Sequence, residues 1–267
     1  MSDAPGQTGD ARPDDATIAW DWVAGLYDTY VTVTADVPFY LAEVVGAAGD
    51  ALELMCGTGR VSIPLAEAGV RLTCVDASAG MLARLREKLA QRPTAARNIT
   101  LIEADVRRLA LDRQFDVILL PFHAFAEVTA RADQQRLLTT VAGLLRDGGR
   151  FICPLHNPPM RRATLDGQLR LVGRFPQGAG QLHVWSVASY DPISQIADGA
   201  QLYEEYDSAG TMLRKRQLPI QFSLLDHHQF EAMALAAGLR VSALYGDYTY
   251  APFHPENSPY QVWSLTK

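Results

Sequence analysis

The hydrophobic and polar positions follow two periodicities between residues 51 and 156. Short apolar runs, typical of buried strands, alternate with stretches in which apolar side chains recur every three or four positions, typical of amphipathic helices. Over residues 79–91, for example, Met81, Leu82, Leu85 and Leu89 share one helical face. This pattern predicts strands at 51–56, 71–76, 98–105, 115–121 and 150–155, and helices at 60–68, 79–91 and 133–145.

Strands separated by helices of this length form β-α-β units, which build a parallel sheet covered on both faces. Ligands of such sheets bind beyond the carboxyl ends of the strands. The residues that directly follow each apolar run are therefore the candidate binding residues.

The rhythm changes after Pro154. Residues 181–191 and 200–222 are expected to form antiparallel strands, with a turn at 207–210, and a helix is expected from Asp226 to Ala237. The last residues are expected to add a hairpin to the edge of the sheet. Before the first strand, residues 18–45 are predicted to form one or two helices, interrupted near Pro38.

Composition and charge narrow the class of protein. The 267 residues are 48% hydrophobic and 20% charged, which is typical of a globular protein. A net charge of −6 gives no basic field for nucleic acid or for an anionic membrane surface. No apolar run reaches the roughly 18 residues that a membrane span needs, so no membrane association is predicted. The three cysteines have neither zinc-site nor disulfide spacing, which favours a cytoplasmic location, and no metal site is expected.

The segment LELMCGTGR, residues 52–60, places a glycine turn directly after the first predicted strand. A P-loop needs a Lys followed by Ser or Thr, which is absent, and Ser62 replaces the third glycine of a dinucleotide fingerprint. Glu53 disfavours an anionic pyrophosphate and suits a ligand that carries an ammonium and a sulfonium group. S-adenosylmethionine is such a ligand.

Acidic residues also end the next two strands. Asp76 can accept both hydroxyl hydrogens of a ribose, and Asp105 can accept the adenine amine, with the Met81 thioether against the ring. NAD sites also use an acid after the second strand, and either aspartate could simply cap a helix. Glu53, the glycine turn and the two aspartates in this order favour a common site.

At this point the chain resembles the class I S-adenosylmethionine-dependent methyltransferases, in the branch that acts on small molecules. The resemblance is carried by LELMCGTGRVSIPLAEAG, VDASAGML, IEADVRRL, FDVILLPFHAF and LLRDGGRFICPLHNP, and Met55 departs from the Gly or Ala of many relatives. It implies an α/β fold with a Rossmann-like, mostly parallel seven-stranded sheet, helices on both faces and a small antiparallel β lid. The cofactor-binding residues that it implies are Tyr27, Tyr30, Glu53, Cys56, Gly57, Gly59, Asp76, Ala77, Met81, Ala104, Asp105, Val106, Leu120 and Phe122.

The composition, the strand pattern and the resemblance together give the expected organisation of the chain. Residues 1–17 form a disordered tail, 18–46 an N-terminal helical cap, 47–156 the cofactor-binding core, 157–222 an antiparallel substrate lid, and 223–267 a helix and hairpin that complete the sheet.

The residues that contact the methyl acceptor are less well defined. His123 follows the fourth strand, near the expected methyl position, and its usual pKa suits a catalytic base. Both a catalytic and a structural role remain open for it. The other candidates for substrate contact are His156, Asn157, Trp185 and Tyr203.

The sequence therefore predicts a methyltransferase that acts on an oxygen or nitrogen atom of a small metabolite. It is expected to be a monomer or homodimer and to serve secondary metabolism. A nucleotide-dependent oxidoreductase and a non-catalytic cofactor-sensing protein are the alternatives. The sequence does not name the acceptor.

Overall fold

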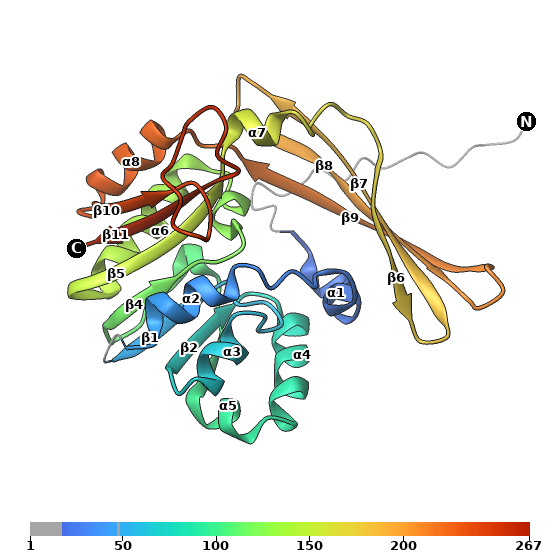
Figure 1. Cartoon of the computed structure of the whole chain (residues 1–267), viewed down its shortest axis with the longest axis horizontal. Coiled ribbons are helices and arrows are strands. Elements are labelled where there is room, and N and C mark those ends of the chain that lie inside the picture. Colours follow the sequence, from blue (N-terminus) through green and yellow to red (C-terminus); the bar gives the residue numbers. More distant parts are fainter. Residues whose placement is uncertain (1–17, 47–48) are drawn as a thin grey trace, which may run out of the picture.

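A computed structural model describes residues 18–46 and 49–267, in which helices cover a larger β-sheet and a smaller sheet extends from it (Figure 1). The expected disordered tail, residues 1–17, lies outside the described residues. None of the described helices is both long and apolar enough to cross a membrane.

The larger sheet has seven strands in the order β10-β11-β5-β4-β1-β2-β3. The five strands β1 to β5 run parallel to one another, and β11 pairs antiparallel with both β5 and β10. The predicted fold class, including the terminal hairpin at the sheet edge, is therefore confirmed. The strands are β1 (Asp50–Leu54), β2 (Arg71–Asp76), β3 (Ile99–Glu103), β4 (Phe115–Leu119), β5 (Leu145–His156), β10 (Arg240–Tyr245) and β11 (Tyr260–Thr266).

Helices cover both faces of this sheet because successive strand residues point to opposite sides. Leu52 and Leu54 of β1 belong to a core that includes side chains of α6 and α8, whereas Ala51 belongs to a second core shared with α2, α3, α4 and α5. The helices are α2 (Val37–Val44), α3 (Ser62–Glu67), α4 (Ala79–Ala90), α5 (Pro93–Asn98), α6 (Arg131–Leu144) and α8 (His227–Ala236).

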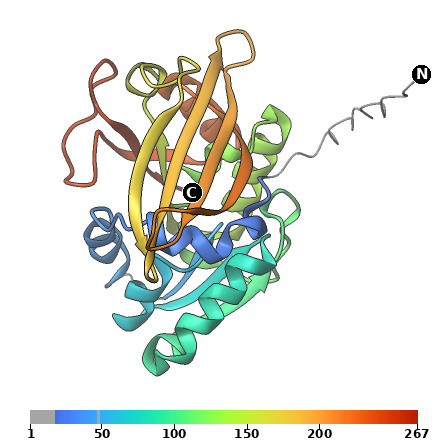
Figure 2. The ribbon, with the colours of Figure 1, turned by 90° about the vertical axis from the view of Figure 1, so that its right-hand side faces the viewer.

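The smaller sheet is antiparallel, in the order β6-β7-β8-β9, and it arches away from the larger one (Figures 1 and 2). A third core joins it to α1 (Ala24–Tyr30), where Leu26 and Tyr30 meet Leu182 and Tyr203. The chain enters this sheet through α7 (Pro158–Arg162), and its strands are β6 (Arg170–Gln177), β7 (Gly180–Asp191), β8 (Ile196–Tyr206) and β9 (Met212–Ser223).

Some elements differ from the prediction. The interruption between the first two helices lies at residues 31–36, and Pro38 stands in the first turn of α2, where its missing N–H costs no hydrogen bond. Strand β5 begins at Leu145, earlier than expected. The pattern did not indicate α5 or β6. Strand β6 contains Gly173 and Pro176, which normally argue against a strand, but it lies at a sheet edge, where proline is tolerated.

We expect Phe230→Ala to lower the free energy of unfolding by about 3–5 kcal/mol, because it empties a packed aromatic site. Phe230 is fully buried, with ring centroids 5.3 Å from Phe125 and 5.1 Å from Trp263. Leu235→Ala on the same helix, at a side chain that is 54% exposed, is the matched control, and it should change that free energy by less than about 0.5 kcal/mol. Urea unfolding measures both, and equal losses in the two variants would contradict the packing of α8 onto the sheet.

Candidate active site

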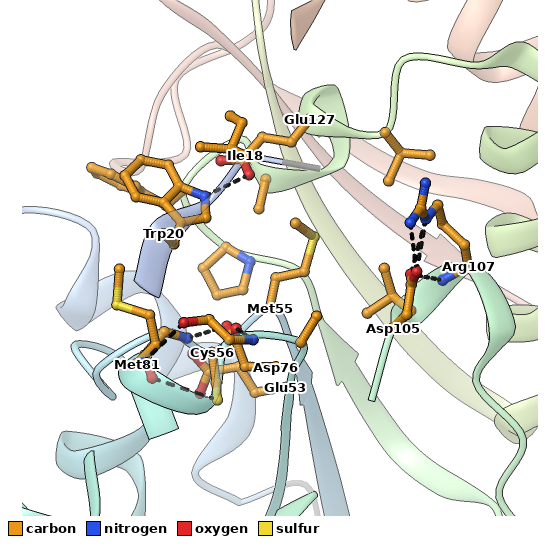
Figure 3. A pocket seen from close by; sticks show the side chains of 18 of the residues that line it. Ile18, Trp20, Glu53, Met55, Cys56, Asp76, Met81, Asp105, Arg107 and Glu127 are labelled. Carbon is orange, nitrogen blue, oxygen red and sulfur yellow. Dashed lines mark hydrogen bonds and ion pairs between the residues drawn. The ribbon is translucent and has the colours of Figure 1, made fainter. Parts of the chain in front are cut away.

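A cavity of about 680 Å³ opens at the carboxyl ends of the parallel strands (Figure 3). Met55, Asp76, Asp105 and Pro121, which end or follow β1, β2, β3 and β4, form its floor and sides. The segment Ile18–Asp21, which leads into the short 3₁₀ helix η1 (Trp20–Trp22), lines it as well. The cavity is thus enclosed by the sheet tips and by the chain that precedes the first strand.

The structure brings most of the expected cofactor residues to this cavity. Those that line it are Tyr27, Glu53, Cys56, Gly57, Asp76, Ala77, Met81, Asp105, Val106 and Phe122. The remaining four, which are not among its lining residues, are Tyr30, Gly59, Ala104 and Leu120.

The glycine turn needs an unusual backbone at three positions. Met55, Gly57 and Gly59 have φ values of 55°, 56° and 83°, a region that L side chains rarely adopt. A Cβ atom on Gly57 would meet nothing within 4 Å, so this glycine leaves open space on the cavity side. A Cβ on Gly59 would lie 2.3 Å from Leu85 Cδ1, so this glycine instead lets the turn pack against α4.

Asp76 connects the tips of β1 and β2. Its Oδ2 accepts a hydrogen bond of 2.7 Å from the Gly57 N–H, and its Oδ1 accepts one of 2.8 Å from the Ser78 N–H. Ser78 in turn caps α4, with its hydroxyl accepting from the Met81 N–H. Burial raises the pKa of Asp76 despite these bonds. Each carboxylate oxygen keeps a lone pair, so the group can still accept hydrogen bonds from a diol.

Glu53 is a buried carboxyl group at the cavity wall. The Ser62 hydroxyl donates a hydrogen bond of 2.6 Å to its Oε2, and burial raises the pKa of Glu53 to about 8. A buried carboxylate without a cation is costly, and a ligand ammonium group would remove that cost. This feature fits the expected ligand better than a phosphate.

Asp105 has a partner that the sequence did not predict. Arg107 donates to it from its backbone N–H at 2.9 Å, from Nε at 2.9 and 3.0 Å and from Nη2 at 2.6 Å. These hydrogen bonds lower the pKa of Asp105, which therefore stays ionised and remains an acceptor at the cavity edge.

His123 does not lie where the sequence led us to expect. It is not among the residues that line the cavity, and its ring stacks on that of His156 at 4.0 Å and lies 4.9 Å from that of Tyr260. Both Phe122 and His123 have positive φ values, and this backbone leaves Phe122 at the cavity with His123 outside it. Burial lowers the pKa of His123 to about 4, so it is neutral at physiological pH. The geometry gives no support to a role as the base.

The other expected acceptor contacts, His156, Asn157, Trp185 and Tyr203, also lie outside the cavity lining. The Asn157 amide donates to the Pro255 and Ser258 carbonyl oxygens, both at 2.8 Å. The Trp185 indole donates to Glu204 at 3.0 Å. The Tyr203 hydroxyl lies 3.0 Å from that of Tyr30 and donates to Gln201. In the structure these side chains hold parts of the fold together.

Several residues that line the cavity were not among the predicted site residues, and Arg60, Trp20 and Glu127 are the most informative of them. Arg60 donates to both oxygens of Asp36, at 2.5 and 2.7 Å, and its guanidinium lies 4.7 Å from the centre of the Phe122 ring. The position of Arg60 directly after the glycine turn could have identified it as a site residue. Trp20 and Glu127 meet at one end of the cavity, where the indole N–H donates a hydrogen bond of 3.0 Å to Glu127 Oε2. Glu127 is the single acid in the apolar stretch 121–128, a signal that sequence reasoning did not use.

No group of His, Cys, Asp or Glu side chains with the arrangement of a metal site occurs within residues 18–46 and 49–267.

The family described as "Methyltransferase domain" matches residues 51–149. The cypemycin N-terminal methyltransferase of a Streptomyces species is 30% identical over 207 residues, which cover 76% of this chain and 77% of that protein.

Two solved structures share the fold. The CcbJ methyltransferase from Streptomyces caelestis has a TM-score of 0.79 at 24% identity, covering 94% of this chain and 98% of that one. The sugar N-methyltransferase KedS8 from a Streptoalloteichus species has a TM-score of 0.71 at 19% identity, covering 100% and 99%. With the strand order and the glycine turn described above, these matches show that the chain belongs to the class I S-adenosylmethionine-dependent methyltransferases.

Proposed function

We propose that the cavity holds S-adenosylmethionine and a small metabolite together, and that the enzyme transfers the methyl group to a nitrogen or oxygen atom of that metabolite. The observation that carries this proposal is one cavity whose floor is the glycine turn with Glu53, Asp76 and Asp105, and whose opposite wall is the segment Ile18–Asp21. Its volume lies within the roughly 300–1,000 Å³ of small-molecule sites.

Each cofactor residue has a proposed role. Glu53 and the glycine turn hold the aminocarboxylate end, Asp76 accepts the ribose hydroxyl groups, and Met81 packs on the adenine. Asp105 accepts the adenine amine while it remains bonded to Arg107. When bound, S-adenosylmethionine supplies a methyl group that is electrophilic because its sulfur is positively charged.

The residues around the cavity act by positioning and by excluding water. Tyr27 lines the cavity from α1, with its ring centroid 5.7 Å from Trp20 and 5.6 Å from Tyr30. These rings bring the N-terminal segment over the sheet tips and join it to the smaller sheet through Tyr203. In-line transfer depends on such positioning and on a dry site.

We place the reaction in the cytoplasm and in secondary metabolism. The three cysteines, Cys56, Cys74 and Cys153, are free and buried, in keeping with the reduced thiols of the cytoplasm. The related proteins named above include an N-terminal methyltransferase and a sugar N-methyltransferase. Their names support a small metabolite as the acceptor and a role in secondary metabolism. The acidic net charge argues against a nucleic acid as acceptor.

Asp76 is predicted to contribute to cofactor affinity. Asp76→Ala should weaken binding of S-adenosylhomocysteine by at least roughly 30-fold, because it removes charge-assisted hydrogen bonds to the ribose. Glu103→Ala is the matched control, since Glu103 pairs with Asp76 across the β2–β3 register but lies outside the cavity. Isothermal titration calorimetry measures both. Undiminished affinity in Asp76→Ala would remove this residue from the proposed site.

The free energy of unfolding should depend on pH through Glu53. The folded-state pKa of Glu53 is raised from 4.5 to about 8, so the stability provided by its protonated form is fully present below pH 4.5 and is lost as the pH rises through about 8. The free energy of unfolding of the wild type, relative to that of Glu53→Gln, should therefore fall from pH 5 to pH 8. Saturating S-adenosylhomocysteine should reduce this difference, because its ammonium group stabilises the ionised carboxylate.

Urea unfolding at several pH values, with and without the ligand, measures the effect. A constant difference between the two proteins without ligand would show that Glu53 ionises at its ordinary pKa.

A further inference from the structure

The cavity contains a carboxylate that the proposed cofactor contacts do not use. Glu127 ends the 3₁₀ helix η3 (Ala124–Glu127), which follows the tip of β4. Figure 3 shows Glu127 and Trp20 at the end of the cavity opposite Glu53, Cys56 and Asp76. Its carboxylate is therefore on the far side of the space from the glycine turn.

The two oxygens of Glu127 have different surroundings. Oε2 accepts the Trp20 indole hydrogen bond at 3.0 Å, which fixes the orientation of the carboxylate. Oε1 has no hydrogen-bond partner among the described residues, and it is not one of the side-chain oxygens that are buried without a partner. One oxygen is thus held by the protein, and the other is open to a ligand in the cavity.

No Lys, Arg or His in the described part of the chain forms an ion pair with Glu127. Burial raises the pKa of Glu127 to about 7, the Trp20 hydrogen bond lowers it, and the negative charge of Asp76 raises it. Glu127 in turn contributes to a raised pKa of Tyr27. The charged or titratable groups that line the cavity are Asp21, Tyr27, Glu53, Cys56, Arg60, Asp76, Asp105, Arg107, Glu127 and Asp133.

The aspartates that line the cavity, unlike Glu127, have protein partners for their carboxylate groups. Asp21 accepts from the Ser78 hydroxyl and the Gly80 N–H, Asp105 is bonded to Arg107, and Asp133 pairs with Arg136. Asp76 accepts two backbone N–H groups. Glu127 is left with one carboxylate oxygen open to the cavity and with no cationic partner among the described residues.

We propose that the methyl acceptor is an amine, and that Glu127 Oε1 binds its ammonium form and takes up the proton before transfer. This inference rests on the proposed function. The amine enters as an ammonium ion, and one N–H proton moves to Glu127. The freed nitrogen lone pair forms a bond to the methyl carbon, the carbon–sulfur bond breaks, and its electron pair stays on sulfur. The product leaves as an N-methylated ammonium ion, and the Glu127 proton passes to water.

The chemistry of the group decides for nitrogen over oxygen. A hydroxyl acceptor carries no positive charge for the carboxylate to bind, and its proton has to be removed during the transfer itself. An amine needs only the loss of its ammonium proton, and the carboxylate also attracts the cation. His123, the other base considered, does not line the cavity.

The experiment uses matched acceptor pairs and matched variants of the full chain. The acceptor probes are a tripeptide with a free amino terminus against its hydroxyl counterpart, and an aminosugar against the parent sugar, each with isotopically methyl-labelled S-adenosylmethionine. Glu127→Gln keeps a side-chain oxygen that can accept the Trp20 indole hydrogen bond. Glu204→Gln is the control, since Glu204 also accepts a Trp indole hydrogen bond at 3.0 Å but lies outside the cavity.

We expect label only in the amine member of each pair, and a loss of roughly 100-fold or more in kcat/KM for Glu127→Gln. Affinity for S-adenosylhomocysteine should stay within about threefold of the wild type in both glutamine variants, and Glu204→Gln should retain turnover. The pH profile adds a readout that a structural role would not change. Wild-type kcat/KM should fall below pH 7, whereas that of Glu127→Gln should rise with pH towards the pKa of the amine itself.

A second measurement does not depend on turnover. The nuclear magnetic resonance signal of the Trp20 indole N–H should shift with a midpoint near pH 7 in the wild type, and this titration should be absent in Glu127→Gln. A midpoint below pH 5 would overturn the inference, because Glu127 would then be too weak a base.

Comparable labelling of the hydroxyl probes, or the same pH profile in wild type and Glu127→Gln, would also overturn it and leave the proposed function standing. Failure of the wild type to bind S-adenosylhomocysteine would instead overturn the proposed function.

Discussion

The hydrogen bond from the Gly57 N–H to Asp76 Oδ2 joins the tips of β1 and β2, and the site depends on it. It couples the glycine turn, which leaves space for a ligand, to the strand whose next residues begin α4 through the Ser78 cap. Because both strands are parallel and paired in register, their carboxyl ends reach the same edge of the sheet. A ligand at this edge therefore meets a preorganised backbone and a carboxylate that is already oriented.

The wall of the cavity opposite the glycine turn depends on apolar packing. Side chains of α1 and of the smaller sheet form one apolar core, and the hydroxyl groups of Tyr30 and Tyr203 lie 3.0 Å apart within it. This core holds the segment Ile18–Asp21 over the sheet tips, where Trp20 orients Glu127. The smaller sheet thus shapes the site indirectly, by supporting the N-terminal segment, although Gln221 of β9 also reaches the cavity.

Most of the larger sheet could be predicted because each of its strands is a short apolar run and each helix has one apolar face. Most of the residues proposed to bind the cofactor could be placed at the cavity for the same reason, since they directly follow these runs along the chain. Strand β6 could not be predicted, because its glycine and proline normally argue against a strand. Helix α5 could not, because six residues are too few to show a helical period. The placement of His123 also could not, because two consecutive residues with positive φ turn its ring away from the cavity and against His156.

The sequence by itself determined the fold class and the chemical character of the cofactor site, because strand periodicity and the residues after each strand are local properties of the chain. Only the tertiary structure decided which further groups reach the cavity. Trp20 and Glu127 are separated by 107 positions, and their indole-to-carboxylate hydrogen bond exists only because the N-terminal segment is folded back over the sheet. The same folding partly buries Glu127 and raises its pKa towards neutrality, because desolvation depends on the surrounding atoms and not on neighbours in the sequence.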